Sequence, residues 1–165
     1  MARIDISQAD VLVFLRDALR NALALDDRTC FIALDSHLTA PPPSGDLFVT
    51  IVPGASTFDS ELQIGGGQQQ LTEEWHLTIT FYCRGRLDQS GHADAILLED
   101  ARGLYVAKRK VLQALVAEDL ADESGDTFLR QLTPVVSCSE PDWDKDRQIA
   151  WMSLGFTLQW DWDLT

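Results

Sequence analysis

Acidic side chains alternate through the segment D-W-D-K-D-R, at Asp142, Asp144 and Asp146. A calcium-binding loop begins with oxygen ligands at alternate positions. Such a loop also needs a glycine at its sixth position and a bidentate glutamate at its twelfth, where this chain has Arg147 and Ser153. We therefore predict a solvated acidic turn between two strands and no calcium site.

A second group, Glu73 and Glu74 with His76, contains residue types that bind transition metals. Neighbouring residues of a strand point to opposite faces, so Glu73 and Glu74 are expected to be separated. No second histidine motif completes a ligand set. The sequence therefore predicts no metal and no other cofactor.

His37 and His92 lie in or beside predicted loops, and no serine or cysteine near them has the local pattern of an activated nucleophile. The run 65–67 of three glycines is followed by neither a Lys-Ser/Thr pair nor a helix, unlike a phosphate-binding loop. We predict that the protein is not an enzyme. A hydrolase whose residues converge from distant segments stays open as an alternative.

The composition is that of an acidic globular domain, with a net charge of −13 over 165 residues and 45% hydrophobic residues. We expect a single domain over residues 1–165. A surface that binds nucleic acid would need clustered Lys and Arg, and the net charge of −13 argues against such a surface. The opening M-A-R-I-D-I-S has no secretory pattern, and no apolar run reaches membrane-spanning length, so no membrane partner is expected.

The chain has three cysteines without C-x-x-C spacing, at Cys30, Cys83 and Cys138. All three have strand-like sequence surroundings. We expect buried, reduced thiols and no redox or metal role.

The clearest strand in the sequence runs from Glu74 to Gly85. Its odd positions are apolar from Trp75 to Cys83, which indicates a face packed beneath helices. Its even positions are predicted to be too polar for a core. They are His76, Thr78, Thr80, Tyr82 and Arg84.

Two amphipathic helices are predicted, from Ser7 to about Leu25 and from His92 to about Val116. Ser7 with Asp10 resembles a capping box at the start of the first helix. In each helix, apolar residues recur at helical spacing along one side. Each helix is therefore expected to lie with one face on a sheet.

Four further strands are predicted from short apolar or alternating runs. The second of them should be central and end at Pro53 and Gly54, and Pro134 indicates that the third is an edge strand or a strand start. These strands are Thr29–Asp35, Leu47–Val52, Leu132–Ser139 and Gln148–Leu164.

Residues from about 53 to 70 form the least regular stretch and are expected to be a long loop or hairpin arm. Leu62 and Ile64 are apolar residues within it. If the protein self-assembles, these two side chains are candidates for contact with a neighbouring subunit.

The predicted element order is α-β-β-β-α-β-β. Two one-faced helices and about five strands favour a two-layer α+β domain with a mainly antiparallel or mixed sheet. The closing strand, which alternates as clearly as Glu74–Gly85, is its expected neighbour.

The element order and character resemble those of tail terminators and related minor tail or head-to-tail joining proteins of long-tailed bacteriophages. The resemblance covers most of the chain and is carried by the opening helix, F-V-T-I-V-P-G, W-H-L-T-I-T-F-Y-C-R, G-L-Y-V-A-K-R-K-V-L-Q-A-L, P-V-V-S-C-S-E-P and A-W-M-S-L-G-F-T-L-Q-W-D-W-D-L. It rests on no catalytic motif.

This resemblance implies a structural virion protein in the neck region of the tail, assembled in the host cytoplasm. Such proteins form a ring, usually a homohexamer, that closes the tail tube and offers an attachment surface. The implied partners are further copies of the chain, the tail tube protein and a head-to-tail connector or stopper protein. DNA would only pass through the lumen.

The candidate interaction surface combines the polar face of the Glu74–Gly85 strand with the apolar arm residues and the acidic turn. Carboxylates of the turn, or of 118–126, are hypothesised to repel DNA weakly from the wall of a lumen. An acidic exterior that only keeps the protein soluble is the alternative. The candidates are His76, Thr78, Thr80, Tyr82, Arg84, Leu62, Ile64, Asp142, Trp143 and Asp144.

A second class of function is consistent with the same composition. A small, acidic, monomeric cytoplasmic module would bind or inhibit a basic protein. Oligomeric state separates this alternative from a ring subunit.

Overall fold

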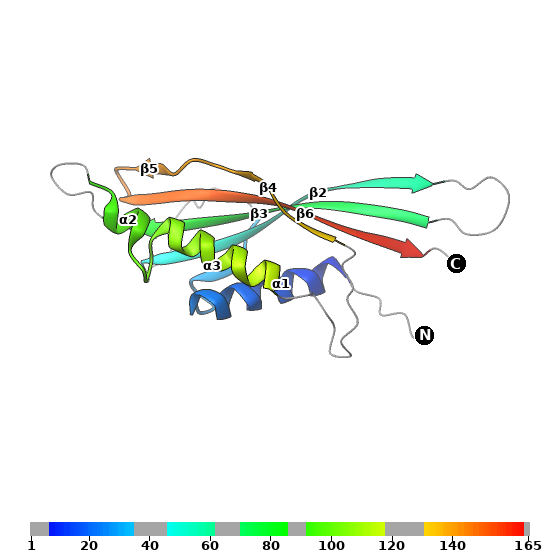
Figure 1. The fold of residues 1–165 in the computed structure, drawn as a ribbon, viewed down its shortest axis with the longest axis horizontal. Coiled ribbons are helices and arrows are strands. Elements are labelled where there is room, and N and C mark those ends of the chain that lie inside the picture. Colours follow the sequence, from blue (N-terminus) through cyan, green and yellow to red (C-terminus); the bar gives the residue numbers. More distant parts are fainter. Residues whose placement is uncertain (1–6, 35–45, 62–69, 86–91, 118–130, 164–165) are drawn as a thin grey trace.

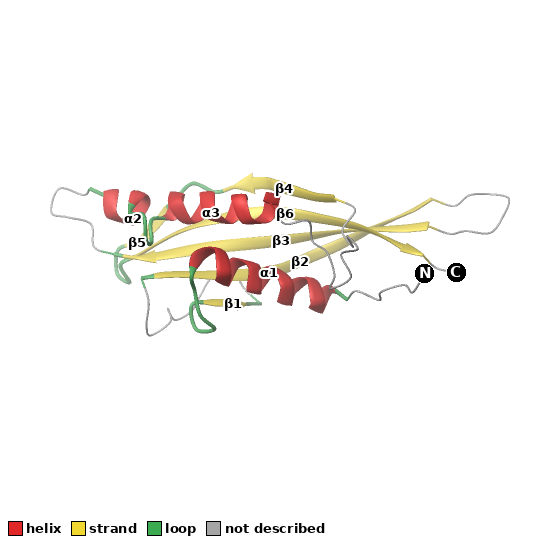
Figure 2. Cartoon of the chain, turned by 60° about the horizontal axis from the view of Figure 1, so that its bottom comes forward, coloured by secondary structure: helices red, strands yellow, loops and turns green. Residues whose placement is uncertain are grey.

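A twisted β-sheet runs the length of the molecule, and helices cover one of its faces over part of that length (Figure 1, Figure 2). The computed structural model describes residues 7–34, 46–61, 70–85, 92–117 and 131–163. The elements are α1 (Gln8–Leu23), β1 (Cys30–Ile32), β2 (Leu47–Glu61), β3 (Gln70–Arg84), α2 (Asp94–Leu98), α3 (Leu104–Ala117), β4 (Gln131–Cys138), β5 (Asp142–Asp144) and β6 (Ile149–Asp163).

The sheet is mixed and has the strand order β1-β2-β3-β6-β4, with β5 also paired to β6. Among the described strands, only β1 and β2 pair in parallel, and the other pairs are antiparallel. The predicted α+β class is therefore confirmed, with six strands where about five were expected. The predicted pairing of the closing strand with Glu74–Gly85 is also confirmed, because β6 pairs with β3 from Gln70 to Arg84.

The main core lies between the helices and the odd-numbered face of β3. Across the sheet, Val49, Phe81 and Met152 form one row, and Ile51, Ile79 and Leu154 form the next. These side chains are buried with one side of α1 and one side of α3, as the alternation and the helical spacing predicted. The helix residues in this core are Val11, Leu15, Leu19, Leu23, Ile96, Leu104, Ala107, Val111 and Leu115.

Helix α1 begins with the predicted capping box. The Asp10 backbone N–H donates to Ser7 Oγ at 3.3 Å, and the Ser7 backbone N–H donates to Asp10 Oδ2 at 2.9 Å. The Ser7 hydroxyl also donates to this carboxylate, and these bonds lower the pKa of Asp10. At the other end, Ala24 adopts the left-handed conformation that ends many helices.

The helix predicted from His92 to Val116 is wrong in one respect, because the chain breaks between α2 and α3. The Glu99 carbonyl accepts bonds from the backbone N–H groups of Arg102 and Gly103, which turns the chain. A Cβ on Gly103 would lie 2.7 Å from the Leu97 carbonyl oxygen, so this close approach requires glycine. The break leaves Leu98, an apolar residue of the predicted helix, 60% exposed.

The prediction that Pro53 and Gly54 end a strand is also wrong. Strand β2 continues to Glu61 and pairs with β3 on both sides of a bulge between Pro53 and Ser56. Strand β1 pairs with β2 only at Val49–Ile51. Pro53 therefore lies in a part of β2 that has one strand neighbour, β3, in the described chain, and proline is tolerated at such an edge.

The bulge itself depends on Gly54. A Cβ there would lie 2.8 Å from the His76 carbonyl oxygen, and the Gly54 carbonyl accepts a 3.0 Å bond from the Trp75 indole N–H. The residues that usually end a strand therefore bend this one without ending it.

The remaining strand predictions differ from the structure mainly in length. The predicted strand Thr29–Asp35 is reduced to β1, and Asp35 lies outside the described residues. Strand β4 is at the edge of the sheet, as Pro134 indicated, and its pairing is irregular between Thr133 and Ser137.

Strands β2, β3 and β6 extend past the helices as a three-stranded arm (Figure 1). We define the arm as residues 57–61, 70–74 and 159–163. Within the predicted irregular segment, residues 53–61 and 70 are strand, and residues 62–69 are not described. Leu62 and Ile64 lie outside the described residues.

Candidate interaction surface

The second face of the sheet carries no helix in the described part of the chain, and most of the predicted interaction residues lie on it. Even positions of β2 and β3 share this helix-free face with odd positions of β6. Its successive rows are Phe48–Tyr82–Trp151, Thr50–Thr80–Ser153, Val52–Thr78–Gly155 and His76–Thr157.

One end of the helix-free face is apolar. The rings of Phe48 and Tyr82 stack with centroids 4.9 Å apart and planes 8° apart. Together with Ile149, and with Trp151 packed against them, they form a second small cluster. Tyr82 is only 5% exposed, so its predicted place on a surface too polar for a core is wrong.

The middle of this face is polar but buried. Thr80 is fully buried, and its hydroxyl lies 2.9 Å from the Ser153 hydroxyl, so Thr80 was also wrongly predicted to be a surface residue. Thr50, its neighbour across the strands, is equally buried. Its hydroxyl has no hydrogen-bond partner in the described structure.

The exposed end of this face is the part near the arm. His76 Nδ1 lies 3.1 Å from the Thr157 hydroxyl, and His76 Nε2 lies 3.8 Å from Glu74 Oε1. The side chains of His76 and Glu74 are about half exposed. Thr78 and Arg84 are half-buried. The sequence prediction of an accessible polar surface therefore agrees best with His76.

Gly155 allows β4 to approach this face closely. A Cβ at Gly155 would lie 2.6 Å from the Ser137 hydroxyl oxygen. Residues of β6 and β4 therefore belong to this surface, although the sequence-based list named none of them. The alternation of Trp151, Ser153 and Thr157 was visible in the sequence, and the missing information was the strand order.

The predicted acidic turn leads from β5 to β6. Asp144 Oδ1 accepts 3.0 Å bonds from the backbone N–H groups of Asp146 and Arg147, so this carboxylate stabilises the turn. Trp143 packs against the main core, and Asp142 is exposed. Of the three candidates in this segment, Asp142 alone has an exposed side chain.

The acidic group around His76 is divided between the two faces, as the alternation predicted. Glu73 is 2% exposed on the helix side, where the Gln8 side-chain amide donates to its Oε1 at 2.7 Å. The same amide nitrogen lies 3.1 Å from the Ser56 hydroxyl. Within the described ranges, no three His, Cys, Asp or Glu side chains are grouped as metal ligands would be.

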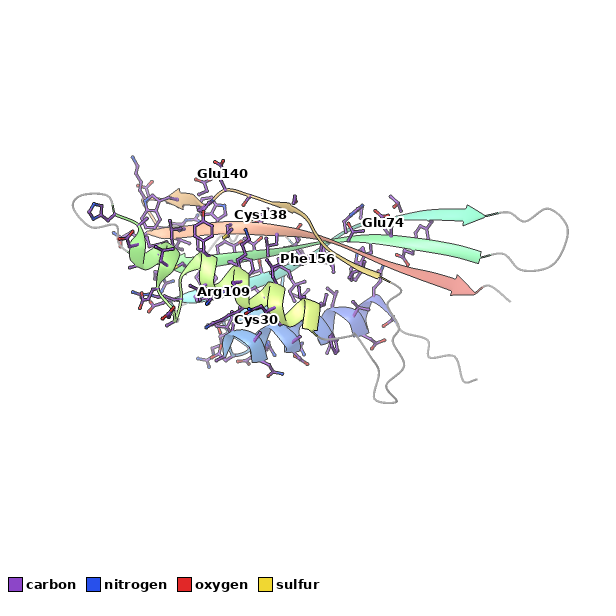
Figure 3. All side chains as sticks on the ribbon, in the orientation of Figure 1. Cys30, Glu74, Arg109, Cys138, Glu140 and Phe156 are labelled. Carbon is purple, nitrogen blue, oxygen red and sulfur yellow. The ribbon has the colours of Figure 1, made fainter. Side chains whose placement is uncertain are left out.

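The prediction that the three cysteines are buried is correct for two of them. Cys30 and Cys83 are buried free thiols, and burial raises the pKa of each to about 11. Cys138 is a free but exposed thiol, so its predicted burial is wrong. Lys108 Nζ of α3 lies 3.3 Å from its sulfur, and Figure 3 shows Cys138 above α3.

No protein-family model and no curated protein sequence matches the chain. None of the described helices is long and apolar enough to cross a membrane.

The geometry of the helix-free face is suited to contact between proteins. Its apolar end is already packed, whereas its arm end presents polar groups on a regular strand framework. Strand edges and extended faces of this kind bind other chains through backbone hydrogen bonds and side-chain contact.

Proposed function

We propose that the protein is a structural subunit of a bacteriophage tail, which forms a ring at the end of the tail tube and offers the surface for attachment of the head or connector. The three-stranded arm is the observation that carries the proposal. It extends beyond the helix layer that covers the rest of the sheet (Figure 2).

The arm leaves backbone groups available for contact. Strand β1 pairs only with Val49–Ile51, so the described chain supplies no strand neighbour to β2 from Val52 onward on that side. An exposed edge of this length is a place where another polypeptide can pair. A subunit that completes its sheet or covers its arm against a neighbour has the geometry required for an assembly.

The strongly acidic composition also supports this proposal. With a net charge of −13, the protein as a whole repels a polyanion. A ring built from such subunits lets DNA pass through its lumen without strong adhesion. The exposed carboxylate of Asp142 and the charge of 118–126 are the groups proposed to face that lumen, and the structure does not describe the latter segment.

Native mass spectrometry and negative-stain imaging of the purified full chain test the proposal, with and without polymerised tail tube protein. We expect closed rings, hexameric by mass, either in solution or at the ends of the tubes. A protein that stays monomeric at high concentration and leaves tube ends bare would overturn the proposal and favour the small acidic binding module.

A further inference from the structure

Helix α3 carries an unusual concentration of positive charge for this acidic protein. Lys108, Arg109 and Lys110 are consecutive, and α3 contains no acidic residue. None of the three forms an ion pair with a carboxylate in the described structure. Lys110 Nζ donates to the Asp100 carbonyl, and Lys108 contacts Cys138.

Other basic residues near the helices have acidic partners. Arg16 Nε lies 2.9 Å from Asp17 Oδ1, and Arg102 Nη1 lies 2.7 Å from Asp46 Oδ2. Arg109 is exposed, and Figure 3 shows it on α3. The positive charge of Arg109 is therefore available to an external anionic group, whereas Lys108 and Lys110 are half-buried.

The arm has the opposite charge. Its residues include no Lys or Arg in any of the three strands, and it extends away from α3 of the same copy (Figure 1). Apart from Glu73, which is buried against α1, its acidic residues are Asp59, Glu61, Glu74, Asp161 and Asp163.

We propose that the arm of one copy docks on α3 around Arg109 in the next copy, and that this contact joins the subunits of the proposed ring. The anionic partner is thus supplied by the chain itself. Binding of a separate polyanion to α3 would be opposed by the net charge of −13. This inference rests on the proposed function for the closure of the ring.

Exposed aromatic residues accompany the charges on both surfaces. Phe58 of the arm is 58% exposed, and Tyr105 of α3, one helical turn before Arg109, is 42% exposed. Interfaces are enriched in aromatic residues and arginine, which bury apolar area while charged pairs set the register. The two surfaces therefore match in apolar character as well as in charge.

The contact joins two different surfaces, so it repeats head to tail from one copy to the next. A contact of this kind produces a closed ring when the rotation per subunit closes, and an open filament when it does not.

Charge reversal in the full chain tests the docking contact. We expect Arg109→Glu with Lys110→Glu, or Asp59→Lys with Glu61→Lys, to weaken self-association about tenfold or more, measured by sedimentation velocity. Lys145→Glu is the matched control, because Lys145 is an exposed cation in the turn after β5. Circular dichroism and thermal melting verify that each variant is folded.

Combining the two reversals restores opposite charges across the contact. We expect the chain with all four substitutions to recover association. We also expect an equimolar mixture of the two reversed proteins to associate more strongly than either protein alone, because each contact between unlike copies then pairs opposite charges. Loss of association in the control to the same extent, or no recovery in the combined variant, would overturn the docking contact.

The outcomes separate this contact from the ring proposal. Rings that persist in both reversed variants would reject docking of the arm on α3 and leave the proposed function standing. Open filaments that are sensitive to the reversals would support the contact and reject the ring. A monomeric wild type at all concentrations and on tail tubes would reject both.

Discussion

Thr50 and Thr80 are paired neighbours on the helix-free face, and their hydroxyl groups have different environments. Both residues are fully buried, but only the Thr80 hydroxyl has a partner, at Ser153. A buried polar group without a hydrogen bond costs about 1–3 kcal/mol, whereas a satisfied one contributes about 1 kcal/mol. The two threonines therefore form a natural comparison.

We predict that Thr50→Val raises the free energy of unfolding by about 1 kcal/mol, because valine has a similar shape and removes the unpaired hydroxyl. Thr80→Val should lower it by about 1 kcal/mol, because Ser153 then loses its partner. Urea denaturation of both variants measures the difference. Destabilisation by Thr50→Val equal to that by Thr80→Val would contradict the assignment of the hydroxyls.

Phe81 is the central side chain of the main core and is fully buried between its neighbours in β2 and β6. We predict that Phe81→Asp abolishes soluble folded protein, because it removes a large apolar group and buries an unpaired charge. Val13→Asp is the control, since Val13 is 43% exposed on α1 and should tolerate the change. Soluble yield and circular dichroism measure both outcomes.

At the scale of elements, the sequence predicted the class, the pairing of β3 with β6 and the start of α1 because periodicity and capping are local signals. The break at Gly103 and the bulge at Gly54 depend on which backbone atoms approach each glycine. These approaches are tertiary contacts, so a pattern of apolar residues cannot reveal them. The same limit applies to Tyr82, whose burial depends on stacking with Phe48.

Gly103 and Gly155 test how rigid those approaches are. A Cβ at Gly103 would meet backbone atoms at 2.7 Å, whereas a Cβ at Gly155 would meet a serine hydroxyl at 2.6 Å, which can rotate away. We predict that Gly103→Ala lowers the free energy of unfolding by about 1–3 kcal/mol. Gly155→Ala should cost less than Gly103→Ala in the same thermal or urea denaturation experiments, and the reverse order would contradict this interpretation.

At the scale of the whole molecule, one strand passes through two environments. The part of β3 from Leu77 to Cys83 lies against the helix layer, whereas residues 70–74 belong to the arm. Both parts pair with β2 and β6, so their backbone hydrogen bonding is similar. They differ in the apolar layer that covers them.

We predict that amide hydrogen exchange in the isolated subunit is at least about tenfold slower for 77–83 than for 70–74, because burial against helices raises the free energy of local opening. Exchange measured by mass spectrometry on overlapping peptides provides this comparison within one strand. Assembly through the arm should reduce the difference. Equal protection in the isolated subunit would show that the arm is as stable as the helix-covered body.

The side of β2 from Val52 to Glu61 that has no strand neighbour among the described residues also affects how the protein is kept from aggregating. A long free strand edge can recruit any extended chain, including misfolded copies of the same protein. Pro53 removes one backbone donor from this strand, the bulge after it bends the strand, and Asp59 and Glu61 add repulsion between like edges. These residues guard against indiscriminate stacking of sheets, so Pro53→Val and Asp59→Val would create an aggregation-prone edge without altering the main core.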